Sequence, residues 1–490
     1  MAKLSTDNSY FGGAFVVSNL FDTRRNVSNK FDITKALFPK ILRGVSLLLC
    51  TLWIQGCVVM ENKFSLIAPG IWRAELQLAP KEMVSTQDNE IHSARQLLTD
   101  KDAKVLPEDV KKRDEATEGA LPFLFEIKYL SDSVFTMTII NGEERIPVAA
   151  EDIKVGRNRE TGKDTILINF PVFGSYIRGM YQERVMEGEW IVPAKNLTVP
   201  FLARYGQQHR FTTLAKKPIA DLTGKWACTF DLASEKPYNA VGELTQNGNI
   251  LRGTFRTETG DYRYLDGEVQ GEKFYLSCFD GAHAFVFEGK IKQDGRLDGI
   301  FRSGKGTPEI WQATRNENAE LKDANTLTTL KSNNSTVSFS FPNAAGKTIG
   351  LNDYKGKVKV IQIMGTWCPN CRDETTFLSN YVNILKNDNL AVVALAFERN
   401  ADVAAKQVGI YKEKMHVPYE ILIAGTTTKK DDATKALPWL DQVIAYPTMI
   451  ILDKNDKVRR IHTGFDGPAT SKYAAFEKEF KEFVETLLKE

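Results

Sequence analysis

The chain has 490 residues, of which 42% are hydrophobic and 26% are charged, so it is long enough to build two or three separate cores. Its 64 Lys and Arg residues against 62 Asp and Glu residues leave a formal net charge of +2, without the basic stripe or long charge block that would favour nucleic acid as a partner. Six cysteines in a chain this long exclude a disulfide-rich scaffold and indicate a few special sites.

A short export signal is predicted near the N-terminus. A basic segment precedes an apolar run at 45–54, which is too short for a membrane-spanning helix of about twenty residues. Gly56 directly before Cys57 is similar to a bacterial lipobox, in which the cysteine carries the lipid. We therefore expect residues 1–57 to be an N-terminal extension with a signal, and Cys57 to be a lipid anchor. An uncleaved signal anchor and a buried core helix are the alternatives.

The middle of the chain is predicted to form two mainly-β regions, at 58–216 and 217–315. In the second region, the expected strands begin about every eight to twelve residues, which is typical of an up-and-down barrel or a sandwich. A lipocalin-like barrel would supply a ligand cavity. A charged interval at 82–120 is predicted to be an inserted helix or loop. Both regions open with Gly-x-Trp, at Gly70 and Gly224, so a duplicated β unit is one interpretation. The expected strands are 72–78, 124–129, 134–140, 165–169, 198–204, 241–244, 251–257, 262–269, 274–278, 285–291 and 297–302.

The second β region also contains residues that bear on chemistry. Asp280 and Gly281 are typical of a hairpin turn, with His283 at the start of the next strand, and we expect a structural role for all three. Alternation along their strands directs Cys228 and Cys278 into one core. Two buried thiols are expected there, with a disulfide as the alternative.

A polar linker at 316–335 is predicted to lead into a C-terminal domain at 336–490. This domain alternates strands and helices, which predicts a central sheet with helices on both faces. The expected strands are 357–364, 390–397 and 449–453, and the expected helices are 375–385, 403–415 and 473–488. A stretch at 423–437 is expected to shape substrate access, and His462 is expected in a late structural turn.

The motif Trp-Cys-Pro-Asn-Cys at 367–371 follows an apolar run and precedes a helix-like stretch. Two sulfurs on one helical turn can close a small disulfide, and the unpaired N–H groups of a helix N-terminus favour a thiolate at Cys368. Cys368 is therefore the expected nucleophile. Cys371 is the expected resolving cysteine, which releases the substrate by thiol-disulfide exchange. A zinc site needs a second Cys or His pair, which does not follow, so neither a metal nor a cofactor is expected. A static disulfide is the alternative.

A second element supports the same chemistry from far along the chain. Tyr446 and Pro447 stand at the entrance of the apolar strand 449–453, where a proline cannot donate a ladder hydrogen bond. We interpret Pro447 as a cis proline in a loop that faces Cys368, with an ordinary trans proline as the alternative. The backbone before such a proline can pair with an extended substrate. Trp367, Tyr446 and Pro447 are therefore predicted to bind the substrate.

These segments, together with 339–351 and Glu374, resemble the thioredoxin-like, membrane-tethered TlpA/ResA family of thiol-disulfide reductases over about the last third of the chain. The resemblance implies that Glu398, at the end of an apolar strand, lies near the cysteine pair and exchanges protons with it. A solvated strand-end glutamate is the alternative. Gln362 stands where cytoplasmic thioredoxins carry a buried aspartate, so the direction of electron flow is left open.

The expected fold is multidomain, with two mainly-β regions followed by an α/β thioredoxin-like domain. The resemblance implies an exported enzyme, lipid-anchored to a bacterial membrane on the periplasmic or surface face of the cell envelope. Its substrates would be protein disulfides and its electron donor a CcdA/DsbD-like transmembrane thiol carrier. One alternative is a ligand- or partner-binding surface lipoprotein with a redox-inert module, and a weaker one is a thiol peroxidase. In a third interpretation the β regions select substrates for the redox domain.

Overall fold

The computed structural model describes residues 64–79, 84–85, 91–92, 119–332, 335–429 and 431–490. The predicted export signal, the lipid anchor at Cys57 and most of the 82–120 interval lie outside the described residues. The chain from Phe64 to Glu490 forms one compact unit. No helix within the described ranges is long and apolar enough to cross a membrane.

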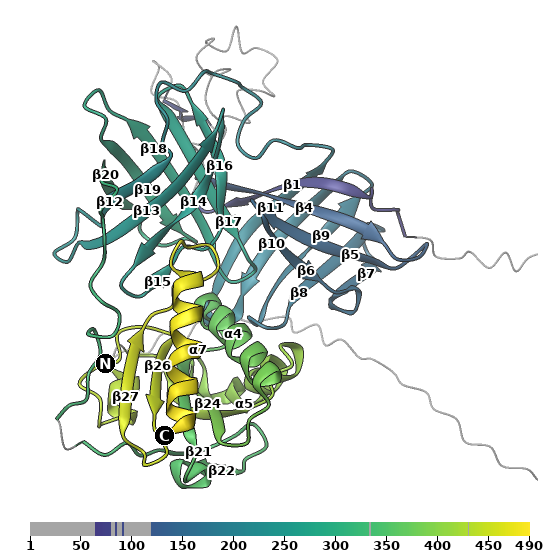
Figure 1. The fold of residues 1–490 in the computed structure, drawn as a ribbon. Helices are drawn as coiled ribbons and strands as arrows, with labels where there is room; N and C mark the ends of the chain where they lie inside the picture. The colour runs from purple at the N-terminus through teal and green to yellow at the C-terminus, as the bar shows by residue number, and fades with distance from the viewer. Residues whose placement is uncertain (1–63, 80–83, 86–90, 93–118, 333–334, 430) are drawn as a thin grey trace, which may run out of the picture. The chain divides into compact units, whose positions relative to one another are not determined.

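The first β region forms a nine-stranded antiparallel sheet, drawn in purple at β1 and in blue tones elsewhere in Figure 1. Its strands are β1 (Gly70–Gln77), β4 (Ala120–Tyr129), β5 (Phe135–Asn141), β6 (Glu144–Val148), β7 (Ile153–Arg157), β8 (Asp164–Phe170), β9 (Ser175–Gln182), β10 (Val185–Val192) and β11 (Leu197–Tyr205). They lie in the order β6-β5-β4-β1-β11-β10-β9-β8-β7. The short strands β2 (Val84–Ser85) and β3 (Ile91–His92) pair separately. Short 3₁₀ turns stand at η2 (Ala150–Asp152) and η3 (Pro193–Lys195).

The hairpin of β9 and β10 was not among the predicted strands. Gly179 and Gly188 face each other in its register, and a Cβ on Gly188 would lie 2.1 Å from the carbonyl oxygen of Arg178. The close approach of the two backbones therefore requires glycine. A glycine inside a strand weakens the alternating pattern by which strands are predicted, so the sequence analysis did not predict this hairpin.

The second β region closes into an up-and-down barrel, because β13 pairs with both β12 and β14. Its strands are β12 (Gly224–Phe230), β13 (Tyr238–Asn247), β14 (Ile250–Thr257), β15 (Gly260–Asp261), β16 (Leu265–Gln270), β17 (Lys273–Phe279), β18 (Ala284–Ile291), β19 (Leu297–Ser303) and β20 (Glu309–Arg315). Aromatic rings fill the interior, where Phe230 packs 5.5 Å from Trp311. Cys228 and Cys278 are free thiols buried in this core, so the prediction of two buried thiols is confirmed.

The two β regions share a hydrophobic core. Phe279, at the end of β17, packs 4.4 Å from Phe123 and 5.2 Å from Trp190 of the first sheet. The duplicated Gly-x-Trp start has the same local geometry in both regions, since the indoles of Trp72 and Trp226 each donate to the carbonyl four residues earlier. The two sheets nevertheless differ in strand order, and the additional pairing of β13 with β14 closes the second one into a barrel. The domain boundaries at 216 and 315 stay a prediction.

The C-terminal region folds as the predicted α/β thioredoxin-like domain, around a five-stranded sheet in the order β25-β24-β23-β26-β27. Its strands are β23 (Val358–Met364), β24 (Leu390–Glu398), β25 (Glu420–Thr426), β26 (Thr448–Leu452) and β27 (Val458–Thr463), after the hairpin β21 (Ser340–Pro342) and β22 (Thr348–Gly350). Its helices are α4 (Pro369–Leu385), α5 (Ala404–Lys414), α6 (Asp432–Ala436) and α7 (Tyr473–Lys489), with 3₁₀ turns η4 (Leu351–Tyr354) and η5 (Ala401–Val403). Side chains from α4, α5 and α7 form one core with one face of the sheet. Residues of α6 and β22 pack on the other face.

Two expectations for this domain need correction. Helix α4 begins at Pro369 and not at 375, because proline fits the first helical position, where an N–H has no helical partner. The stretch 423–437 contains the end of β25 and all of α6, and its role in substrate access stays a prediction. His462 lies in strand β27, where it pairs with Met449.

Candidate functional site

Cys368 caps the N-terminus of α4. Its Sγ accepts a hydrogen bond from the backbone N–H of Cys371, at 3.3 Å. Cys368 is 7% exposed and Cys371 is completely buried, and both are free thiols. The outer sulfur can therefore meet a partner while the inner one is shielded, which is the arrangement that a nucleophilic and a resolving cysteine require.

The proline loop lies directly against the outer sulfur. The peptide bond between Tyr446 and Pro447 is cis, as the sequence predicted. The Cys368 thiol donates a hydrogen bond to the carbonyl oxygen of Tyr446, at 3.2 Å. Trp367 packs edge-on against Tyr446 with 5.4 Å between ring centroids, and its indole donates to the carbonyl of Phe397 at 2.9 Å. The structure thus brings together Trp367 and Cys368, from the loop after β23, with Tyr446 and Pro447, from the loop before β26.

Glu398 is buried at the end of β24 and holds the loop before the motif. Its two carboxylate oxygens accept hydrogen bonds from the backbone N–H of Thr366, at 3.0 Å, and from the Thr366 hydroxyl, at 2.7 Å. Burial raises the pKa of Glu398, and the bonds from Thr366 work against that rise. Glu398 is therefore not the solvated glutamate of the alternative reading. Its exchange of protons with the cysteines stays a prediction.

Glu374 was not assigned a role from the sequence, yet it lies on α4 one turn after Cys371. Its side chain is completely buried, and neither carboxylate oxygen has a hydrogen-bond partner. Burial raises the pKa of Glu374 to about 8; the nearby amide of Gln362 works against this rise, and the Cys368 thiolate adds to it. Burial also raises the pKa of Cys371 well above its usual value, with contributions from Cys368 and from Glu374. The spacing Cys-x-x-Glu, which puts both side chains on one helix face, was the available signal.

Gln362 contacts the inner half of the motif from strand β23. It is fully buried, its amide nitrogen donates to the carbonyl oxygen of Cys371 at 3.2 Å, and its amide oxygen accepts from the Thr375 hydroxyl at 3.2 Å. A neutral amide at this position takes no proton. Of the residues described here, Glu374 is thus the ionisable group on the same helix face as the inner thiol.

A buried arginine of the barrel is ion-paired with the helix that carries the motif. Arg263 pairs with Asp373 on α4, with Glu144 of the first sheet and with Asp280, the last at 3.4 Å. Arg263 is 2% exposed, so one buried cation is shared by three carboxylates. Such a network is costly to break, because removal of one partner leaves the other charges buried and unpaired.

The β15 hairpin of the barrel covers one side of the motif. The side-chain amide of Asn370 donates to the carbonyl oxygen of Asp261, at 3.3 Å, and the Asp261 carboxylate accepts from the backbone N–H of Gly467, at 2.8 Å. Gly260 has φ +141°, and a Cβ there would lie 2.0 Å from the Asn370 side chain. Burial raises the pKa of Asp261 to about 7. The barrel therefore contacts the cysteine motif itself.

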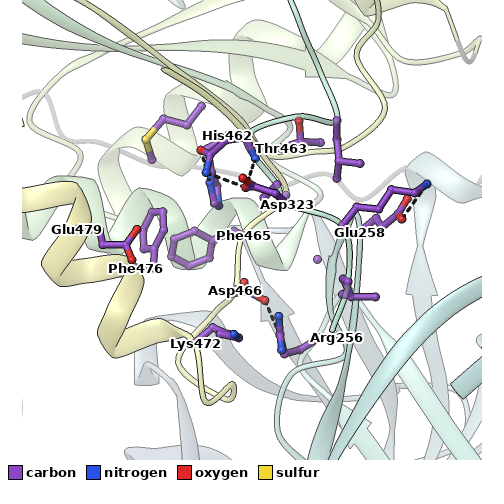
Figure 2. Close-up of a pocket in the computed structure, with 18 of the residues that line it drawn as sticks. Arg256, Glu258, Asp323, His462, Thr463, Phe465, Asp466, Lys472, Phe476 and Glu479 are labelled. Carbon is purple, nitrogen blue, oxygen red and sulfur yellow. Dashed lines mark hydrogen bonds and ion pairs between the residues drawn. The ribbon is translucent and has the colours of Figure 1, made fainter. Parts of the chain in front are cut away.

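A separate cavity of about 260 Å³ lies between the barrel, the linker and β27 (Figure 2). Arg256 bonds to Asp466 there at 2.9 Å, and His462 and Lys472 also line it. Neither cysteine of the motif lines this cavity. Within the described ranges, no group of three His, Cys, Asp or Glu side chains could hold a metal ion.

A dithiol at a helix N-terminus, facing a cis-proline loop on a five-stranded sheet, defines the class of thioredoxin-fold proteins. The Redoxin family model matches residues 331–476. The thioredoxin-like protein YneN of Bacillus subtilis is 31% identical over 126 residues, which are 26% of this chain and 68% of that protein. The thiol-disulfide oxidoreductase ResA of Geobacillus thermodenitrificans is 26% identical over 126 residues, which are 26% of this chain and 66% of that protein. Through its C-terminal domain, the chain belongs to the thioredoxin-like family of thiol-disulfide oxidoreductases.

Solved structures cover a similar share of the chain. A thiol:disulfide interchange protein of the thioredoxin family from Chlorobium tepidum is 20% identical, with a TM-score of 0.25, and covers 31% of this chain and 95% of its own. The thioredoxin domain of a thiol-disulfide oxidoreductase from Bacteroides vulgatus is 20% identical, with a TM-score of 0.24, over 31% of this chain and 99% of that domain. The curated relatives, in contrast, are matched over only about two thirds of their length.

Proposed function

We propose that the protein is an exported thiol-disulfide oxidoreductase that reduces protein disulfides through the Cys368 and Cys371 dithiol. The observation that carries this proposal is the position of Cys368. Its sulfur caps a helix N-terminus and contacts the carbonyl of Tyr446 before the cis proline. A sulfur in that place is exposed to a partner on one side and stabilised by helix N–H groups on the other.

In the first step the Cys368 thiolate attacks one sulfur of the substrate disulfide. The substrate S–S bond breaks, a mixed disulfide forms with Cys368, and the leaving substrate thiolate takes up a proton. The backbone of Tyr446 is available to pair with an extended substrate segment, and Trp367 and Pro447 form the adjoining surface. These three residues are the proposed docking site.

In the second step Cys371 attacks the sulfur of Cys368 and releases the second substrate thiolate. Cys371 must first lose its proton, which its buried surroundings oppose. Glu374 is the proposed acceptor, because it lies on the same helix face and its raised pKa brings it closer to that of a thiol. Two electrons leave the dithiol, and the protein is left with a disulfide between Cys368 and Cys371. An external dithiol must then reduce it.

The setting of this reaction is also proposed. A lipid on Cys57 would tether the protein to the outer side of a bacterial membrane, in the cell envelope. A CcdA/DsbD-like membrane thiol carrier would then supply the electrons. Both proposals rest on the sequence pattern near the N-terminus and on the resemblance to the TlpA/ResA family.

The test is the reduction of a peptide disulfide by the pre-reduced full-length chain. We expect one substrate disulfide reduced per protein molecule, with loss of the free thiols of Cys368 and Cys371 in differential alkylation. Cys368→Ser is expected to reduce none. Cys228 and Cys278 serve as internal controls, because their buried thiols stay unmodified in the native protein. A substrate left oxidised while both thiols stay free would overturn the proposal.

A further inference from the structure

Both β regions contribute to a cavity of about 250 Å³. Trp190 and Lys195 reach it from the end of β10 and the turn η3, His283 from the turn between β17 and β18, and Lys305 from the turn after β19. We call this cavity the Lys195 pocket. Its walls come from segments at 190–197, 282–284 and 303–306, so no local sequence pattern predicts it.

The Lys195 pocket lies within electrostatic range of the nucleophile. Arg399 stacks over the ring of Trp367, 4.2 Å from its centroid. Burial and the nearby Arg399 lower the pKa of Lys195 to about 8, while Asp280 and the Cys368 thiolate act in the opposite direction. Burial likewise lowers the pKa of Arg399, and the Cys368 thiolate opposes it. The wall of the pocket is also connected to the cysteine motif by contacts, because Arg263 lies 3.4 Å from Asp280 and donates to the carbonyl oxygen of Pro369 at 3.4 Å.

The walls of the pocket carry hydrogen-bond donors that have no acceptor. Trp190 is 1% exposed, and its indole N–H has no hydrogen-bond partner, which is uncommon for a buried donor. Nδ1 of His283 is also unpaired and lies 3.7 Å from the Asp280 carboxylate. Among the described residues, neither Lys195 nor Lys305 forms an ion pair. The pocket thus offers an unmatched indole N–H and two ammonium groups.

Asp280 adjoins His283 but is not among the residues that line the pocket. Asp280 lies 3.4 Å from the guanidinium of Arg263, and its other oxygen accepts from the backbone N–H groups of Ala282 and His283, at 2.8 and 2.6 Å. Both oxygens of Asp280 are therefore engaged outside the lining of the pocket, and its charge opposes only in part the lowering of the Lys195 pKa. The described residues that line the pocket include Lys195 and Lys305 and no Asp or Glu side chain, which favours an anionic group in a site that is partly shielded from water.

We propose that the Lys195 pocket binds a carboxylate of the disulfide substrate while Cys368 attacks the substrate sulfur. This inference rests on the proposed function and adds a substrate class, disulfides with an acidic group close to the cystine. It also gives the β regions a part in substrate choice. The size of the pocket matches one acidic side chain or a chain-terminal carboxylate, not a folded partner.

The experiment uses the full-length reduced chain and two disulfide peptides that differ only in Glu or Gln next to the cystine. The measured quantity is the ratio of kcat/KM for the Glu peptide to that for the Gln peptide. We expect the wild type to prefer the Glu peptide by about 3- to 10-fold, in the range of one partly shielded charge pair. We expect Lys195→Gln, which keeps the length of the side chain, to reduce this ratio to about 1. Added salt should lower the wild-type ratio.

Lys478→Gln is the matched control, because Lys478 is an exposed lysine on α7 outside the pocket. It should keep the wild-type ratio. Oxidised glutathione forms a second arm of the experiment. It is a small disulfide that carries carboxylates but has no longer peptide segment around the cystine. A Lys195-dependent rate with it identifies small acidic disulfides as substrates. Dependence confined to the peptide identifies acidic protein segments. Either result supports recognition of a carboxylate.

A wild-type ratio near 1, or an equal ratio in the wild type and Lys195→Gln, would overturn the inference. The proposed function has its own readout in the same assay. If the wild type reduces the Gln peptide above the rate of Cys368→Ser, the reductase proposal holds while the pocket proposal fails. If it reduces neither peptide, the reductase proposal itself fails.

Discussion

Glu374 provides the sharpest test of the proposed chemistry, through the substitution Glu374→Gln. The carboxyl group is buried next to the inner thiol, with a pKa of about 8. Glu374 can accept a proton only when it is ionised, so the rate of the resolving step should rise with pH up to about the pKa of Glu374. About a tenth of the molecules carry the carboxylate at pH 7 and half at pH 8. The resolving step should therefore speed up about fivefold between these values and less than twofold above them.

Glu374→Gln removes the acceptor and keeps the shape of the side chain. Cys371 must then lose its proton to water or hydroxide, and its raised pKa makes this slow. We expect the resolving step to fall by about 10²- to 10⁴-fold near pH 8, the usual contribution of a positioned base. In the variant the rate should rise about tenfold per pH unit, without a break near pH 8.

The assay uses an aromatic disulfide reagent that releases one coloured thiolate when Cys368 attacks and a second when Cys371 resolves the mixed disulfide. Stopped-flow measurement separates the two steps. The mixed disulfide lacks the negative charge at Cys368, one of the causes of the raised pKa, so the break should lie at or slightly below pH 8. The same break in the wild type and in Glu374→Gln would refute the reasoning.

Three further predictions concern the surroundings of the dithiol. Cys371→Ala should trap the substrate as a mixed disulfide on Cys368, visible as a mass increase that added thiol reverses, whereas turnover by such a variant would contradict the resolving role. Glu398→Gln should keep the break near pH 8 in the stopped-flow assay, and loss of the break would move the proton acceptor from Glu374 to Glu398. Arg263→Met should lower the free energy of unfolding in urea by about 3–5 kcal/mol, because the buried Asp280 and the partly buried Glu144 and Asp373 lose their cation. Arg178→Met is the control, because Arg178 is exposed, and it should lower the free energy of unfolding by less than about 1 kcal/mol. Equal losses of stability in Arg263→Met and Arg178→Met would contradict a buried network around Arg263.

The redox motif was predictable because its chemistry is local. A few consecutive residues determine the motif, namely a cysteine at a helix N-terminus, a proline in the first turn and a second cysteine one turn later. The proline loop was predictable because a proline stands directly before an apolar strand. Strands with regular alternation, such as β8 and β14, were predicted for the same reason. The regular spacing of the strands predicted a barrel or a sandwich, and the pairing of β13 with β14 makes it a barrel.

What the sequence did not reveal depends on tertiary packing. Glu374 looks like any acidic residue of a helix until the fold buries it without a partner. The turn at Asp280 was predicted correctly as a turn. Its place between Arg263 and the Lys195 pocket, however, results from three segments that meet only in the folded chain. Neither burial nor such a meeting of distant residues can be read from spacing along one strand or helix.

The most direct test of the account is the reduction potential of the Cys368 and Cys371 couple in the full-length chain. The protein is equilibrated in thiol-disulfide buffers of graded potential, and the two cysteines are scored by differential alkylation and mass spectrometry. The account predicts a reversible two-electron couple near about −270 mV, the range of a reductase. A value near about −120 mV would contradict the reducing direction, and the absence of a reversible couple would contradict a dithiol enzyme altogether.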